Sequence, residues 1–514
     1  MPVPGAPDSP PSGSADAGAT AAGTGGGILA NVTYSLISLL SSGVFTAILT
    51  LYLVRALAPS QYGDFALAVG IGALVALPGD FGVSSSTARF VAEHRADPPG
   101  LAAVLADGVR LELIASAVAC GALAALADPI AAAFQAPLSW PLRVIAVAVL
   151  GQNLMVLFER SFIAAGRAST YVRVAFGESA MECSASVVLV LLGGGALVAT
   201  AGRALGYIFG ALLALILAAR AFGWPAALRR PGRRSNAGRI ARYAVPLMLV
   251  DGATVLFSMV DVLLIGVYLG TKQVGLFSAP VRLLPFFYYP SLAVANGVAP
   301  RMARGLGNEP DGAALAGGLR GLVLFYSLLL APLIIWTRPI VDILLGGNYG
   351  GSITTLRVLS ISVYLGGIAP LVSVSANFLG DARSRIPLMI GAALLDGAID
   401  VVLIPRIGIV SGAIATAAAF LVMNVGHLAI CARHVKLPFS RIAVTALRAL
   451  AAAASMAIVL ALIGTRPSIP MLIVGAVLGT MAFLLALVVL QELSRPELTK
   501  AWLWTRTRVT LLRH

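Results

Sequence analysis

The chain has 514 residues, of which 59% are hydrophobic and only 11% carry a charge. A soluble protein of this length needs far more charged residues to cover its surface, so the composition excludes that class and indicates a membrane protein. The net charge of +14 raises nucleic-acid binding as a possibility, but the distribution of the positive residues along the chain argues against it. The three cysteines, at positions 120, 183 and 431, show neither metal-ligand spacing nor a disulfide pattern.

Residues 1–27 consist mainly of Gly, Ala, Ser and Pro, with two aspartates and no Lys or Arg. This segment cannot bury enough apolar surface to fold, so we predict a disordered cytoplasmic tail. It lacks the basic start of a signal peptide, and the first apolar segment is therefore expected to remain in the protein.

The rest of the chain alternates between apolar segments and short turns. About fourteen segments are each long enough to cross roughly 30 Å of hydrocarbon. Backbone groups in lipid must bond within the segment, and the alternating pattern of barrel strands is absent, so we predict an all-α integral membrane protein. The predicted segments are 30–55, 62–84, 104–127, 142–165, 173–194, 198–219, 244–269, 274–299, 319–344, 354–379, 386–405, 409–431, 443–464 and 470–491.

One hairpin sequence is repeated. The stretch "LAPSQYGDFALA" (57–68) aligns with "LGTKQVGLFSAP" (269–280), and "PLRVIAVAV" (141–149) aligns with "TLRVLSISV" (355–363). Segments 1–6 and 7–12 therefore form two copies of one six-helix unit. Because six is even, both copies enter the membrane in the same orientation, which is the parallel repeat found in secondary transporters.

This repeat defines the predicted domains. An N-lobe (28–221, segments 1–6) is joined by a basic cytoplasmic linker (222–242) to a C-lobe (243–434, segments 7–12). The two extra C-terminal helices occupy 435–492, and 493–514 form a basic cytoplasmic tail. Two such lobes can rock around a central cavity.

The positive residues lie mainly on one side of the predicted membrane. Most of the 36 Lys and Arg fall in the turns on the side of the linker, in the linker itself and in the tail. The positive-inside rule then places both termini in the cytoplasm. The run "RRPGRRSNAGRIAR" (229–242) is accordingly interpreted as a topology anchor at the anionic leaflet rather than a nucleic-acid site.

Motifs for catalysis are missing from the sequence. It contains no phosphate-binding loop of the form G-x-x-x-x-G-K-[ST], no HExxH zinc motif and no G-x-S-x-G nucleophile elbow. The outer turns are also too short to hold a sugar acceptor. We predict a protein that is not an enzyme and that uses no cofactor or metal centre.

Arg282 lies within the eighth segment, where a charged side chain costs about 2.5–3.5 kcal/mol and is expected to face a cavity or a partner. Two compatible interpretations are open. Arg282 either holds an anionic head group in the cavity or forms an ion pair with Asp251 or Asp261 of segment 7. Together with Arg55, these residues are the predicted substrate-binding set.

Two pairs of acids lie four residues apart. Glu178 and Glu182 share one face of segment 5, and Asp396 and Asp400 share one face of segment 11. The repeat aligns Glu182 with Asp396. Such pairs are candidates to carry a coupling proton or sodium ion, and the alternative is a structural role as neutral, hydrogen-bonded acids.

Several stretches resemble the Wzx-like oligosaccharide flippases, which belong to the multidrug/oligosaccharidyl-lipid/polysaccharide exporter superfamily. The opening hairpin with "GDFGVSSSTARFVAEHR", the segment "VDGATVLFSMVDVLLIGVYLGTKQVGLFSAPVRL" and the junction "DGAIDVVLIPRIGIVSGAIAT" carry the likeness. The resemblance implies a bacterial inner-membrane flippase for an undecaprenyl-pyrophosphate-linked oligosaccharide in cell-surface or exopolysaccharide synthesis. It also implies proton or sodium coupling, contact with membrane lipids, and polymerase machinery as a partner.

The same resemblance implies a cavity cation at Arg282 and an aspartate near Asp261. Family members commonly carry asparagines where this chain has Asp396 and Asp400, so a titratable role gains weight here. Two other functions stay open. One is a cation-coupled multidrug extruder, and an acidic cavity without Arg282 would favour it. The other is a non-transporting scaffold in an envelope-polymer complex, and a blocked cavity would favour that.

Overall fold

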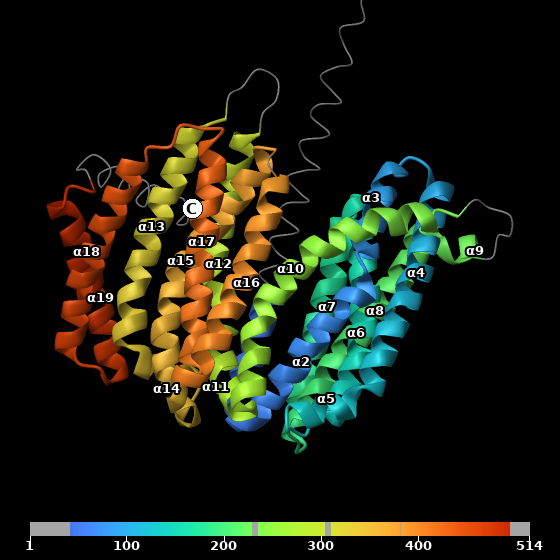
Figure 1. Cartoon of the computed structure of the whole chain (residues 1–514), viewed down its shortest axis with the longest axis horizontal. Coiled ribbons are helices and arrows are strands. Elements are labelled where there is room, and N and C mark those ends of the chain that lie inside the picture. Colours follow the sequence, from blue (N-terminus) through green and yellow to red (C-terminus); the bar gives the residue numbers. More distant parts are fainter. Residues whose placement is uncertain (1–41, 229–234, 304–309, 381, 494–514) are drawn as a thin grey trace, which may run out of the picture.

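The structure is a computed structural model that describes residues 42–228, 235–303, 310–380 and 382–493. Within these ranges every regular element is a helix (Figure 1). The predicted tail 1–27, part of the linker and the tail from residue 494 onward lie outside the described residues.

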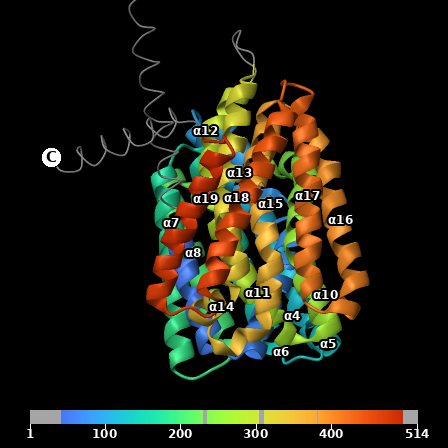
Figure 2. The same ribbon diagram turned by 90° about the vertical axis from the view of Figure 1, so that its left-hand side faces the viewer.

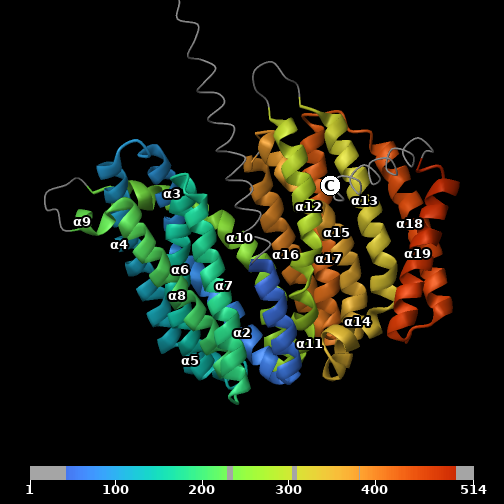
Figure 3. The ribbon, with the colours of Figure 1, turned by 180° about the vertical axis from the view of Figure 1, so that it is seen from behind.

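The N-lobe is a bundle built on a helix described from Ser42 to Ala56 and on eight further elements. These are α2 (Pro59–Asp80), α3 (Val83–Glu93), α4 (Pro98–Ala125), α5 (Ala127–Ala133), α6 (Ser139–Ala164), α7 (Ala168–Leu191), α8 (Ala196–Phe222) and α9 (Trp224–Leu228). Helix α10 (Ala237–Leu269) then runs obliquely from the N-lobe to the C-lobe (Figures 1 and 3).

The C-lobe forms the second bundle. After α10 it contains α11 (Thr271–Val281), α12 (Leu284–Val298), the short η1 (Ala299–Met302), α13 (Gly312–Ile335), α14 (Thr337–Leu344), η2 (Gly347–Ser352), α15 (Ile353–Phe378), α16 (Ala382–Ile407) and α17 (Val410–Ala432). Helices α18 (Phe439–Ile463) and α19 (Ile469–Val489) pack on the outside of α13, on the edge far from the N-lobe (Figures 1 and 2).

The all-α membrane architecture is confirmed. Among the described residues, eleven helices are long and apolar enough to cross a membrane, or twelve if α4 and α5, bent by 54°, form one span. The total of fourteen stays a prediction, because the first segment is described only from residue 42 and the eighth is broken into α11 and α12. The break falls at Arg282 and Leu283, just before Pro285, which has no N–H to continue the hydrogen-bond ladder.

The repeated hairpin forms the contact between the lobes. A Cβ at Gly63 of α2 would lie 1.8 Å from the carbonyl oxygen of Thr271, and a Cβ at Gly275 of α11 would lie 1.8 Å from that of Pro59. Residues 59 and 271 are themselves equivalent in the repeat, so the two contacts are reciprocal. Only glycine lets the two helices approach this closely.

The lobes therefore meet at one end, which we name the crossing end; α5, α11 and α14 lie there. The opposite end, with α3, α9 and the start of α10, is the linker end (Figure 1). At the crossing end one apolar core runs from the N-lobe into the C-lobe and includes Phe65, Phe277 and Tyr349. The remaining C-lobe helices share a second core around α13, α15 and α17.

Candidate functional site

A small polar pocket lies beside the lobe contact. It takes residues from the 42–56 helix, α2, α7 and α8 of the N-lobe, and Arg282 from the break between α11 and α12. Its lining residues are Phe45, Thr46, Leu49, Thr50, Leu53, Tyr62, Phe65, Ser179, Glu182, Arg203 and Arg282. The cavity volume is about 30 Å³, which leaves room for water but not for a pyrophosphate.

Arg282 extends from the C-lobe into this N-lobe pocket. Its guanidinium carbon lies 6.0 Å from the ring centre of Phe65, which is a weak cation–π contact. Among the described residues no carboxylate or hydrogen-bond acceptor pairs with this side chain. An unpaired guanidinium between two apolar bundles is a site that favours an anion.

A second arginine in the pocket is already neutralised. Arg203 of α8 donates to Glu182 of α7 at 2.6 Å and to the hydroxyl of Tyr207 at 2.6 Å. Glu178, one turn away, is buried and accepts from Ser179 at 2.9 Å. Arg203 is not among the site residues predicted from the sequence. The signal was an arginine well inside an apolar span, facing a glutamate in the preceding one.

The acids of the C-lobe gather elsewhere. Asp261 of α10 and Asp396 and Asp400 of α16 are buried and close enough to interact electrostatically. Asp261 accepts from Thr416 at 2.8 Å, and Asp400 accepts from Ser411 at 2.8 Å.

Hydrogen bonds do not satisfy this cluster. When the three carboxylates are ionised, one oxygen of Asp261, one of Asp400 and both of Asp396 have no donor. Asp261 lies close enough to Asp396 and to Asp400 to share a proton with either. No arginine or lysine pairs with these three acids among the described residues. Buried carboxylates without cationic partners require protons or a bound cation. The searched residues hold no group with the geometry of a metal site.

The structure thus separates residues that the sequence grouped together. Arg282 lines the same pocket as Glu182, without pairing with it, and lies apart from Asp261. The ion pair between Arg282 and Asp261 is therefore not formed in this state. The side chain of Asp251 lies outside the described side chains. Arg55 is exposed and donates to the carbonyl of Ile343 near the crossing end, away from the pocket.

The comparisons with known proteins agree with this architecture. The model of the family described as polysaccharide biosynthesis protein matches residues 28–304, more than half of the chain. The chain belongs to this family. A curated relative, the probable low-salt glycan biosynthesis flippase Agl15 of Haloferax volcanii, is 23% identical over 399 residues, covering 76% of this chain and 80% of its own length.

Solved structures share the fold. The lipid II flippase MurJ in an inward closed conformation has a TM-score of 0.70 at 13% identity, covering 90% of this chain and 99% of its own. A multidrug resistance MATE transporter of the MOP superfamily, inward-facing, has a TM-score of 0.57 at 16% identity, covering 76% of this chain and 95% of its own. The chain is a multi-pass membrane protein of the polysaccharide biosynthesis family, and it has the fold of these solved flippase and transporter structures.

Proposed function

We propose that this protein carries a polyprenyl-pyrophosphate-linked oligosaccharide across the bacterial inner membrane by alternating access, in the synthesis of a surface or exported polysaccharide. The linker end faces the cytoplasm, as the positive-inside rule requires, together with both termini. The observation that carries the proposal is Arg282, an unpaired arginine at the contact between two rocking lobes.

The role of Arg282 follows from its chemistry. A guanidinium stays charged and donates two parallel hydrogen bonds to a phosphate, which an ammonium cannot copy. The pocket is too small for a head group while the lobes touch beside it, so the pyrophosphate enters when the lobes rearrange. The glutamate–arginine pair behind Arg282 leaves the net charge of the pocket at +1 and therefore attractive to an anion.

Ion coupling is assigned to the C-lobe acids. The buried carboxylates of Asp261, Asp396 and Asp400 lack donors when ionised and pair with no cation within the described ranges, so a proton or a sodium ion is the group that satisfies them. The glutamates of the N-lobe are less suited to coupling, because Arg203 already pairs with Glu182.

The proposal is tested by transport of lipid-linked oligosaccharide in proteoliposomes. Arg282→Ala is expected to lose about ten- to a hundredfold in substrate affinity, since a hydrogen bond to a charged group is worth about 1.5–3 kcal/mol. Arg282→Lys should recover only part of this loss. Arg357→Ala, an exposed arginine of α15 that donates only to a backbone carbonyl at 3.2 Å, serves as the control.

The ion-pair interpretation makes a different prediction for the same variants. If Arg282 serves only to neutralise an acid in another conformation, Asp251→Asn or Asp261→Asn should rescue Arg282→Ala. Rescue would show that Arg282 neutralises an acid and does not bind the substrate. Transport of organic cations in place of the lipid-linked sugar would instead support the extruder.

A further inference from the structure

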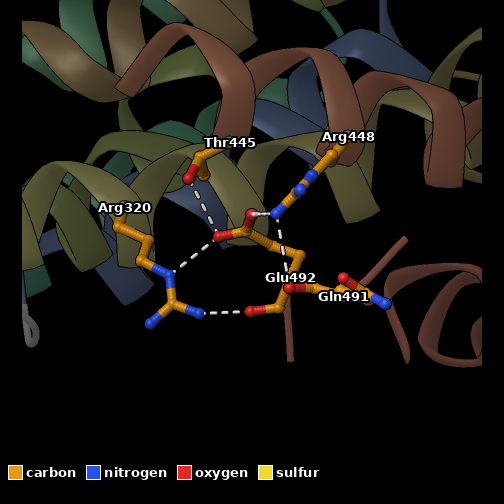
Figure 4. Close-up of polar contacts among 5 residues, drawn as sticks. All are labelled: Arg320, Thr445, Arg448, Gln491 and Glu492. Carbon is orange, nitrogen blue, oxygen red and sulfur yellow. Dashed lines mark hydrogen bonds and ion pairs between the residues drawn. The ribbon is translucent and has the colours of Figure 1, made fainter. Parts of the chain in front are cut away.

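A polar cluster lies at the linker end of α13, α18 and α19, outside both sites described above. Glu492 follows the end of α19, and only 6% of its side chain is exposed. One of its carboxylate oxygens accepts from Arg320 Nε at 2.8 Å and from the hydroxyl of Thr445 at 2.9 Å; the other accepts from Arg448 at 3.3 Å (Figure 4). A single buried carboxylate thus orients two arginines.

Two more cations lie beside this cluster, at the start of α18. Lys436, in the turn before α18, and Arg441, in its first turn, are exposed and make no hydrogen bond or ion pair within the described part of the chain. Asp311, the other acid at this end of α13, is occupied in capping that helix through Ala314 N–H at 2.9 Å. The cations therefore outnumber the carboxylates.

The cluster opens into a groove between α13 and α18. One part has a volume of about 570 Å³, and a neighbouring part that shares Arg320, Arg441 and Thr445 has about 470 Å³. Along α13 the groove is lined by small residues, and along the chain entering α18 by apolar ones: Gly312, Ala313, Ala316, Gly317, Leu437, Pro438 and Ile442. The small and apolar residues thus lie between cations, with Lys436 at the linker end and Arg320 further along α13.

The charges lie at two levels along the groove: Lys436 and Arg441 at its linker end, and Arg320 and Arg448 further along their helices. Arg441 is in the first turn of α18, and Arg448 is seven residues further along, about 10 Å deeper at 1.5 Å per residue. Basic pockets between membrane helices on the cytoplasmic side are a known way to hold anionic lipid head groups. The sequence after Glu492 is itself rich in arginine, so charge complementarity disfavours the tail of this chain as the occupant.

We propose that this groove binds an anionic glycerophospholipid, whose phosphate contacts Lys436 and Arg441 while an acyl chain lies against the small face of α13. Glu492 is a positioning residue that holds Arg320 and Arg448 toward the head group. The site is independent of the transport pathway assigned above, because it lies on the outer edge of the C-lobe (Figure 2).

The test measures binding of phosphatidylglycerol and of phosphatidylcholine to the purified full-length protein in neutral detergent, by native mass spectrometry and by the shift in thermal unfolding. Phosphatidylglycerol is expected to bind at least about tenfold more tightly, and Lys436→Gln/Arg441→Gln should remove this preference. The matched control is Arg406→Gln/Arg466→Gln, which removes two exposed arginines with no described partner at the crossing end.

A second variant tests the acyl chain. A Cβ at Gly317 meets no atom within 4 Å, so the side chain of Gly317→Leu begins in open space, leaves the charges unchanged, and should weaken phosphatidylglycerol binding. Equal binding of the two lipids, or an equal loss in the control variant, overturns the proposal. Undiminished binding by Gly317→Leu, or full competition by inorganic phosphate, would reassign the groove to a free anion.

Discussion

The two positions that the sequence repeat aligns, Glu182 and Asp396, have buried carboxylates with different neighbours in the two lobes. In the N-lobe, Glu182 pairs with Arg203, and Arg282 adds a second guanidinium. In the C-lobe, Asp396, the residue that the repeat aligns with Glu182, meets other carboxylates and no cation among the described residues. The difference in neighbours is what supports the anion site proposed for the N-lobe pocket and the proton or cation site proposed for the C-lobe acids.

The largest effect is expected from the C-lobe acids. Asp396→Asn and Asp400→Asn remove the titratable groups while keeping their size, so gradient-driven transport should fall by about a hundredfold or more, with expression unchanged. The measurement is uptake with and without an imposed proton or sodium gradient. Asp342→Asn, which changes a half-exposed acid near the crossing end, is the control. Normal coupling in Asp396→Asn would leave this cluster a structural role.

The ion pair of the N-lobe should matter mainly for folding. Arg203→Met leaves Glu182 buried without its cation, which costs about 3–5 kcal/mol. The double change Arg203→Met/Glu182→Met should restore most of that stability, as measured by thermal unfolding in detergent. Arg143→Met breaks the more exposed pair with Asp128 and should cost about 1 kcal/mol or less. A double variant as unstable as the single one would show that the pair has a further partner.

The glycine contact between α2 and α11 fixes how closely the two lobes approach at the crossing end. Gly63→Ala would place a methyl group 1.8 Å from the carbonyl oxygen of Thr271, so the crossing end must open. Spin labels at positions 140 and 338, on the two lobes, should report longer distances than in the parent protein. Gly121→Ala, whose new methyl meets no atom within 4 Å, should leave the distances unchanged. An unaltered distance in Gly63→Ala would mean that the helices can slide past each other.

The smallest effect is expected at Glu492, which pairs with Arg320 and Arg448 away from the Arg282 pocket and from the C-lobe acids. Burial opposes its ionisation, but hydrogen bonds from Arg320, Thr445 and Arg448 outweigh burial and hold the pKa of Glu492 below its ordinary value. Stability from this group is therefore present above about pH 4.3 and is lost as the pH falls through the lowered pKa. Glu492→Gln should flatten that part of the pH profile of thermal unfolding. A profile identical to that of the parent would assign the acid sensitivity to other groups.

Much of the fold could be predicted from the sequence. Hydropathy located the helices because lipid forces every span to be apolar and helical. The lobe boundaries drawn from the repeat stay predictions. The pairing of Asp396 with Asp400 followed from helical periodicity alone. Periodicity could not bring Asp261 to them or Arg203 to Glu182, because those contacts join different helices and depend on packing. The break at Arg282 and Leu283 could not be predicted either, since Pro285 indicates where the hydrogen-bond ladder weakens but not how far the helix axis turns.

Arg282 belongs to one lobe while the rest of its pocket belongs to the other. Under the proposed alternating access, a ligand bound between them is a reversible cross-link, and its binding free energy is available only in arrangements that bring both halves within reach. When the lobes separate on that side, the ligand keeps its contacts with only one lobe. Its affinity then falls without any chemical change in the protein. The affinity ratio between the two arrangements equals the factor by which the ligand shifts their populations. Occupancy of the pocket and the rocking of the bundles are thus two measures of the same equilibrium.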